Sequence, residues 1–228
     1  MNLQNWTPRE RPAPYTLAGQ YSQLELLDWS HHGSGLFAAV GGDANADLWT
    51  YMPVGPFSDE SQFEREFQAI RESRDWVTLV IRSAATQNIL GMASYMRIRP
   101  EHGSVEVGCV TFGPDLKRTR EATDAMFLMA QYAFDNLGYR RYEWKCNDAN
   151  QASKRAALRL GFSVEGIFRN DMVVRGVSRD TAWYSITDEE WPTVNHALQA
   201  WLAPANFDPD GNQRLSLAAI REREAVAK

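Results

Sequence analysis

Residues 104–162 read SVEVGCVTFGPDLKRTREATDAMFLMAQYAFDNLGYRRYEWKCNDANQASKRAALRLGF. The run opens with the mostly apolar stretch 104–112, which predicts a strand buried inside a sheet and ended by a glycine and a proline. A loop over residues 115–121 leads into a predicted helix over residues 122–136, because apolar side chains recur there at helical spacing. A strand, a basic loop and a helix therefore follow one another at the centre of this sequence.

The same order of elements returns in the second half of the run. Residues 141–146 predict a strand, residues 147–150 a polar loop, and residues 152–160 a helix that stops at Gly161. A strand–helix–strand unit of this kind is expected to form a right-handed crossover within one sheet.

Further predicted elements lie on both sides of this run. Short alternating or β-branched segments predict strands at 21–29, 77–82, 89–98, 162–168 and 181–186. Apolar residues at helical spacing and acidic first turns predict helices at 36–40, 58–73 and 188–202, with Ser58 as the N-cap of the second. The order of elements predicts an α/β (α+β) fold around one mixed sheet.

Three parts of the chain are distinguished by their composition. Residues 1–20 are rich in proline and polar residues and predict an N-terminal arm. Residues 21–202 are long enough for one domain with its own core. Residues 203–228 predict a C-terminal tail that ends in a short charged helix.

Composition excludes several classes of partner. The net charge of −5 disfavours nucleic-acid binding, which needs a basic face. No apolar run approaches the roughly 20 residues that cross a bilayer, and the N-terminus does not resemble a secretory signal. The two cysteines, Cys109 and Cys146, lie in predicted strands and are expected to be buried free thiols, as in a cytoplasmic protein. The spacing of His and Cys residues predicts no metal site.

The loop before the first central helix carries an unusual concentration of positive charge. Lys117, Arg118 and Arg120 lie together in an otherwise acidic chain, and Thr119 and Thr123 add hydroxyl groups. The first amides of a helix have no partners within it and, with the helix dipole, attract anions such as a pyrophosphate. The alternative is a solvated basic loop that only caps the helix.

Two polar residues open the second central helix. Asn150 and Ser153 lie three positions apart at the helix start. Asn150 could act simply as the N-cap. Alternatively, both side chains could face a ligand held where the two central strands separate.

This ordered set of motifs resembles the GNAT-type N-acetyltransferase superfamily and, within it, the branch that contains ribosomal-protein N-terminal acetyltransferases. The resemblance rests on residues 106–108, 117–125, 137–141, 150–153, 159–162 and 165–166. It implies a mostly antiparallel sheet splayed around an acyl-CoA cleft between the strands at 104–112 and 141–146. It also implies that backbone near Val110 and Phe112 holds the pantetheine arm, and that the amides from Arg118 to Thr123, which include Glu121 and Ala122, hold the pyrophosphate.

One position departs from the family pattern. The phosphate loop of the family usually carries glycine where this chain has Arg120. Glycine allows close approach of the backbone and unusual dihedral angles. The resemblance therefore does not determine the exact backbone geometry of the phosphate-binding loop in this chain. The additional positive charges could compensate for the loss.

The family's usual scheme implies direct attack of an amine on the acetyl-CoA thioester through a tetrahedral intermediate. Ser153 is the candidate donor to the departing sulfur, and Asn150 would position the pantetheine or the sulfur. Glu106 and Glu143 are the candidate bases, although either could instead form a structural ion pair and leave deprotonation to water.

The predicted activity is therefore transfer of an acetyl group from acetyl-CoA to a primary amine, either a small molecule or a protein N-terminus, without a metal. The acceptor residues are expected in the loops 49–57 and 169–179. Within the family, the chain could be a monomer or a homodimer. Two other classes stay open: a degenerate module that binds or senses acyl-CoA, suggested by Arg120, and a nucleotide-binding protein, which lacks the usual phosphate loop.

Overall fold

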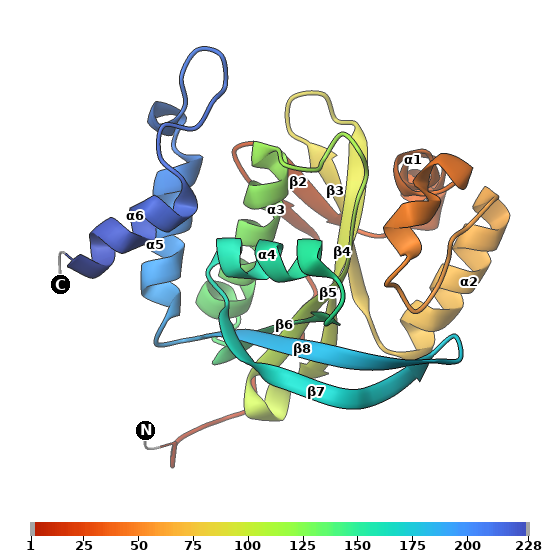
Figure 1. Cartoon of the computed structure of the whole chain (residues 1–228), viewed down its shortest axis with the longest axis horizontal. Coiled ribbons are helices and arrows are strands. Elements are labelled where there is room, and N and C mark those ends of the chain that lie inside the picture. Colours follow the sequence, from red (N-terminus) through yellow and green to blue (C-terminus); the bar gives the residue numbers. More distant parts are fainter. Residues whose placement is uncertain (1–2, 227–228) are drawn as a thin grey trace.

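Eight strands form one sheet in the computed structural model, which describes residues 3–226 (Figure 1). The strands are β1 (Thr16–Ala18), β2 (Ser22–Leu26), β3 (Val77–Ser83), β4 (Ile89–Arg99), β5 (Ser104–Phe112), β6 (Arg141–Asn147), β7 (Ser163–Val174) and β8 (Val177–Thr187). The helices are α1 (Trp29–Val40), α2 (Glu60–Ser73), α3 (Arg120–Gln131), α4 (Gln151–Leu160), α5 (Trp191–Leu202) and α6 (Leu217–Val226).

The strand order across the sheet is β1-β2-β3-β4-β5-β6-β8-β7. Only β5 and β6 pair in parallel, and all other neighbours are antiparallel. The predicted class is therefore confirmed: one mixed, mostly antiparallel sheet flanked by helices. The parallel pair is joined by α3, as a crossover connection requires.

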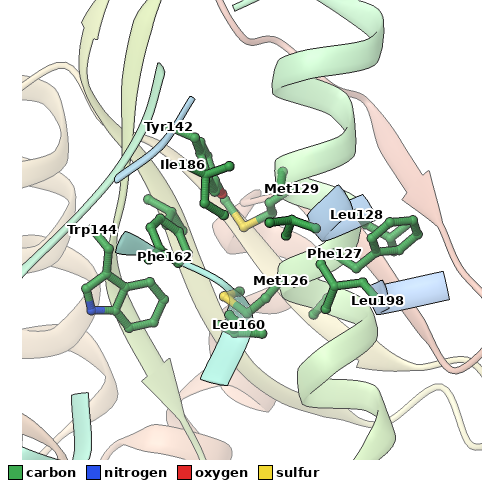
Figure 2. Packing of buried hydrophobic residues seen from close by; sticks show 14 of the residues in the cluster. Met126, Phe127, Leu128, Met129, Tyr142, Trp144, Leu160, Phe162, Ile186 and Leu198 are labelled. Carbon is green, nitrogen blue, oxygen red and sulfur yellow. The ribbon is translucent and has the colours of Figure 1, made fainter. Parts of the chain in front are cut away.

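Both faces of the sheet are covered, because alternate side chains of its strands point to opposite sides. In β3, Leu79 and Ile81 join a core formed with α3, α4 and α5, whereas Val80 joins a second core beneath α1 and α2. Figure 1 shows these two helical groups on opposite sides of the sheet. Met126 and Phe127 of α3 pack with Leu198 of α5 in the first core (Figure 2).

The two terminal segments are part of the packed structure. β1 lies inside the predicted arm and pairs with β2 as the edge of the sheet. In the predicted tail, Leu217 and Ile220 of α6 are buried in the first core, which contains residues of α5. The described part of the tail therefore packs on its own domain.

Several element boundaries differ from the sequence prediction. α1 begins seven residues before the predicted Leu36, because the Asp28 side chain accepts a hydrogen bond from the Ser30 amide and caps an earlier turn. The N-cap of α2 is Asp59 and not Ser58, since the Asp59 carboxylate accepts from the Gln62 amide. β7 and β8 also continue well beyond their predicted ends, to Val174 and from Val177.

Candidate active site

A cleft opens where β5 and β6 separate. The two strands pair only over Ser104–Val107 and Arg141–Trp144, and beyond this point β5 is paired with β4 alone. The cleft has a volume of about 1600 Å³. Next to it, Cys109 and Val110 of β5 both lie opposite a single β4 residue, which makes a β-bulge and bends β5 at this position.

One end of the cleft is formed by the basic loop and the N-terminus of α3. The Thr119 hydroxyl accepts a hydrogen bond from the Ala122 amide at 3.1 Å and caps the helix. Arg118 takes a left-handed backbone conformation, with φ of +65°, to turn the chain into this cap. Every predicted cofactor residue borders the cleft: Val110, Phe112, Lys117, Arg118, Thr119, Arg120, Glu121, Ala122, Thr123, Asn150 and Ser153.

Arg120, which replaces the family's glycine, has a structural partner far away in the sequence. Its guanidinium lies 4.0 Å from the ring centroid of Phe207 and 5.5 Å from that of Tyr21. A cation over an aromatic face is attracted by the ring quadrupole. Phe207, Gly211 and nearby residues of the C-terminal segment also border the cleft. Arg120 therefore holds the C-terminal segment beside the end of the cleft that the basic loop forms.

Arg159 is a further cleft residue, one for which the sequence predicts no site role. It reaches from α4 to the Thr123 hydroxyl of α3 at 3.0 Å, and its guanidinium lies 4.7 Å from the Trp201 ring. Burial lowers the pKa of Arg159, and the nearby charge of Arg221 adds to this effect. Arg159 thus links α3, α4 and α5 at the cleft wall, next to the helix cap.

The two residues that open α4 are bonded to each other and to β6. The Asn150 side chain accepts a hydrogen bond from the Ser153 amide at 3.0 Å, so Asn150 is the N-cap of α4. The Ser153 hydroxyl accepts from the Trp144 indole at 2.9 Å. Since both Asn150 and Ser153 also border the cleft, the N-cap and ligand-facing interpretations are compatible.

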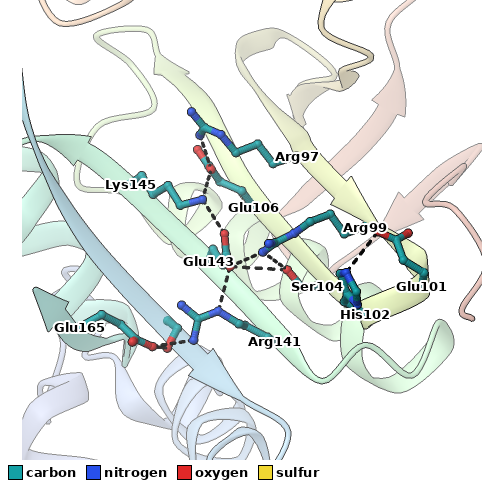
Figure 3. A network of polar contacts seen from close by, with 11 residues as sticks. Arg97, Arg99, Glu101, His102, Ser104, Glu106, Arg141, Glu143, Lys145 and Glu165 are labelled. Carbon is teal, nitrogen blue, oxygen red and sulfur yellow. Dashed lines mark hydrogen bonds and ion pairs between the residues drawn. The ribbon is translucent and has the colours of Figure 1, made fainter. Parts of the chain in front are cut away.

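The two candidate glutamates belong to one buried ion-pair network (Figure 3). The Lys145 ammonium lies 3.0 Å from the Glu106 carboxylate and 2.6 Å from that of Glu143. Arg97 pairs with Glu106, while Arg99 and Arg141 both pair with Glu143 at 2.8 Å. Lys145 therefore separates two carboxylates that face each other across the parallel strands.

The two glutamates differ in their access to the cleft. Glu106 borders the cleft, whereas Glu143 is not among the residues that line it. Burial would by itself raise the pKa of Glu143, but hydrogen bonds from Lys145 and Arg141 outweigh it and hold the pKa below its usual value. Glu143 is therefore ionised at neutral pH, and its carboxylate accepts hydrogen bonds from Arg99, Arg141 and Lys145.

The other end of the cleft is formed by the two loops that were predicted to contact the acceptor. Arg175, at the tip of the β7–β8 hairpin, donates hydrogen bonds to the carbonyls of Met52 and Val54 at 3.3 and 3.2 Å. Met52 borders the cleft, whereas Trp49 is fully buried in the second core. Trp49 thus belongs to an ordinary hydrophobic cluster and does not line the acceptor wall.

Across residues 3–226, no three His, Cys, Asp or Glu side chains gather in a way that could hold a metal ion. None of the helices in this range has the length and apolarity that a bilayer crossing requires.

Comparisons with known proteins agree with this geometry. The sequence model of the acetyltransferase (GNAT) domain family matches residues 24–163. The structure of a GCN5-related N-acetyltransferase from Brucella melitensis superimposes with a TM-score of 0.92 at 44% identity, over 96% of this chain and 100% of that one. The uncharacterized N-acetyltransferase YoaA of Bacillus subtilis is 28% identical over 120 residues, which cover 53% of this chain and 67% of YoaA.

Proposed function

The chain belongs to the acetyltransferase (GNAT) family, and on this premise we propose that it transfers an acetyl group from acetyl-CoA to a primary amine. The observation that carries the proposal is the cleft between β5 and β6, which is lined at α3 by a basic loop and a helix N-terminus and has a hydroxyl, that of Ser153, along its wall. An acyl donor with a pyrophosphate at one end and a thioester at the other matches this order of groups.

The donor-binding residues follow from the chemistry of the cleft wall. Lys117, Arg118 and the first amides of α3 would hold the pyrophosphate, because a helix N-terminus and cations both favour negative charge. Beyond Val107, the β5 edge has no β6 partner, so its backbone from Val110 to Phe112 can hydrogen-bond the amides of the pantetheine arm. Bound in this way, the donor supplies a thioester carbonyl that an amine can attack.

The reaction forms a bond between the amine nitrogen and the carbonyl carbon and breaks the bond between that carbon and sulfur. One proton leaves the amine, and one proton is gained by the departing thiolate. Ser153 is assigned to the second transfer, because its hydroxyl borders the cleft and has one lone pair occupied by Trp144. Its O–H is therefore available to donate to the sulfur.

The first proton transfer is assigned to Glu106, acting through water. Glu106 borders the cleft and Glu143 does not, so a water molecule in the cleft can reach Glu106 alone of the two. The ion pairs of Glu106 with Lys145 and Arg97 hold its carboxylate at the cleft wall, where a water molecule can pass the amine proton on to solvent. Glu143 instead anchors Lys145 and Arg141.

The proposal is tested with purified protein in two steps. A thermal melt with acetyl-CoA should show stabilisation of about 2.7 kcal/mol at 100 times the dissociation constant, or about 5–10 °C, with little shift from ATP. Release of the CoA thiol should then depend on an added primary amine or an N-terminal peptide. Binding without turnover on any amine would instead favour the degenerate acyl-CoA sensor, and absence of binding would overturn the donor assignment.

A further inference from the structure

Two polar groups on the cleft wall have no hydrogen-bond partner among the described residues. They are the Arg179 Nε and the Thr181 hydroxyl, and both atoms are buried. The two residues are alternate positions of β8, so their side chains point to the same face of the sheet. Both residues border the cleft, and Thr181 is only 2% exposed.

Arg179 differs from the other cations around it. Lys145 and Arg97 are paired with Glu106, and Arg175 is bonded to loop carbonyls. Within residues 3–226, Arg179 forms no such ion pair, although the charges of Asp171 and Glu106 act on it from a greater distance. Burial lowers the pKa of Arg179, which means that the surroundings disfavour its charge. A bound anion would remove this disadvantage.

The position of Arg179 in the cleft matters for chemistry. Thr181 pairs with Asn147, the last residue of β6, and Asn147 also borders the cleft. Arg179, two residues before Thr181 on β8, therefore lies on the wall of the cleft where β8 adjoins β6, and not at the end formed by the basic loop and α3. It is suited to contact the acceptor.

We propose that Arg179 and Thr181 form a subsite for an anionic group of the acceptor, a carboxylate or a phosphate. A guanidinium offers several donors in a fixed plane, and an adjacent hydroxyl adds one more, which matches the oxygens of either group. The acceptor is then an amine that also carries negative charge, such as an amino acid, an acidic peptide or an amino phosphate ester. A polyamine would meet an uncompensated guanidinium and be repelled. This inference rests on the proposed acetyl transfer.

The test compares acceptors that differ only in the anion. One set is phenylalanine, its amide and phenethylamine; the other is phosphoethanolamine and ethanolamine. We expect kcat/KM to be about 10- to 100-fold higher for the anionic member of at least one set, because a hydrogen bond to a charged group is worth about 1.5–3 kcal/mol. The set with the larger ratio identifies carboxylate or phosphate as the natural group.

Variants then assign this preference to the subsite. Arg179→Met should remove the preference by raising KM for the anionic acceptor, while Arg179→Lys should retain part of it. Thr181→Val keeps the shape of the buried side chain and should reduce the preference several-fold. This variant keeps the subsite testable if the arginine variants do not fold. Arg65→Met, at an exposed position of α2, is the matched control and should change nothing.

The outcomes separate this inference from the proposed function. If acetyl-CoA binds and amines are acetylated without preference for the anion, the subsite is refuted and acetyl transfer stands. If Arg179→Met lowers kcat equally for every acceptor, the guanidinium acts on the departing sulfur and the subsite is also refuted. If acetyl-CoA does not bind, the subsite is judged by the melting-temperature shift with N-acetylphenylalanine or phosphoethanolamine, which must be lost in Arg179→Met.

Discussion

The indole nitrogen of Trp144 donates a hydrogen bond to the Ser153 hydroxyl at 2.9 Å, across the gap between β6 and α4. An indole N–H can only donate, so it must occupy a lone pair of the serine oxygen. The serine proton is then left to point elsewhere, toward the Cys146 thiol or into the cleft. Trp144 therefore sets the direction in which Ser153 can deliver a proton.

This relationship predicts the effect of two substitutions on turnover. Ser153→Ala should lower kcat about 100-fold, the range typical of a lost proton donor, and change the affinity for acetyl-CoA by less than about threefold. Trp144→Phe should lower kcat less, because the hydroxyl stays but is no longer oriented. Thiol-release kinetics and an acetyl-CoA titration measure the two effects separately.

Ser61→Ala, at an exposed position of α2, is the control for this serine substitution and should leave both constants unchanged. An unchanged kcat in Ser153→Ala would remove Ser153 from the mechanism. A thermal melt is needed alongside, since the variant leaves the buried Trp144 N–H without its partner at a cost of about 1–3 kcal/mol.

The thiol of Cys109 should take no covalent part in the reaction. Burial raises its pKa to about 12, so almost no thiolate exists at neutral pH. Incubation with acetyl-CoA alone should give no acetylated protein by mass spectrometry, and alkylation of Cys109 by iodoacetamide should stay slow up to about pH 10. Unfolded protein is the positive control for labelling. An acetyl adduct on Cys109, or release of CoA before amine is added, would contradict direct transfer.

The ion pairs of Glu143 predict a pH-dependent contribution to stability. The pKa of Glu143 lies below its ordinary value of 4.5 in the folded protein, so the folded state releases this proton more readily than the unfolded state. The resulting stabilisation is fully present above about pH 4.5 and is lost as the pH falls through the folded pKa. Glu143→Gln should therefore destabilise the protein by about 3–5 kcal/mol at pH 7, because it leaves Lys145 and Arg141 with fewer buried partners.

Urea denaturation at pH 7 and at pH 3.5 tests this prediction, with the difference between wild type and Glu143→Gln expected to shrink at the lower pH. Glu64→Gln, on the exposed face of α2, is the control and should show little difference at either pH. A difference that stays constant or grows on acidification would show that Glu143 does not stabilise the fold through its charge.

Arg120 should stabilise both the C-terminal segment and donor binding. Arg120→Met removes the charge from the faces of Phe207 and Tyr21 and should cost about 1 kcal/mol, or about 2–4 °C in melting temperature. The affinity for acetyl-CoA should fall about three- to tenfold, since the C-terminal segment borders the phosphate end of the cleft. Phe207→Leu should have a similar effect, measured by the same melt and titration.

Arg169→Met, at an exposed position of β7, is the control for this charge removal. Arg120→Gly, which restores the residue usual in the family, is the variant that can contradict this prediction. If that variant binds acetyl-CoA more tightly than the wild type, Arg120 weakens donor binding, and its contact with Phe207 contributes to stability alone.

Much of the fold, and the residues that line one end of the cleft, could be predicted from the sequence, because the signals are local. The apolar run 104–112 and the glycine and proline after it predict β5 with both of its ends. The cradle residues from Lys117 to Thr123 are consecutive, so any loop that enters a helix there brings them together. Asn150 and Ser153 likewise share one helical turn.

The tertiary structure alone decided the parts that depend on distant partners. Glu106 and Glu143 look alike in sequence, and only the separation of β5 from β6 exposes one to the cleft while Lys145, Arg99 and Arg141 enclose the other. Burial and ion pairing are set by residues that meet in space, and a side chain's neighbours within its own strand do not reveal them.

For the same reason, the contacts of Arg120 and Arg179 do not follow from their neighbours in the sequence. The sequence determined that Arg120 stands where the family usually has glycine, but the fold alone brings Phe207 beneath its guanidinium. The sequence placed Arg179 in a loop expected to contact the acceptor, but the fold extends β8 through it and leaves its buried Nε on the cleft wall without a partner among the described residues. Local patterning determined the elements of this protein and the basic loop that enters α3, whereas packing decided the surroundings of Glu106, Arg120 and Arg179, because the charge balance there depends on which strands and loops meet.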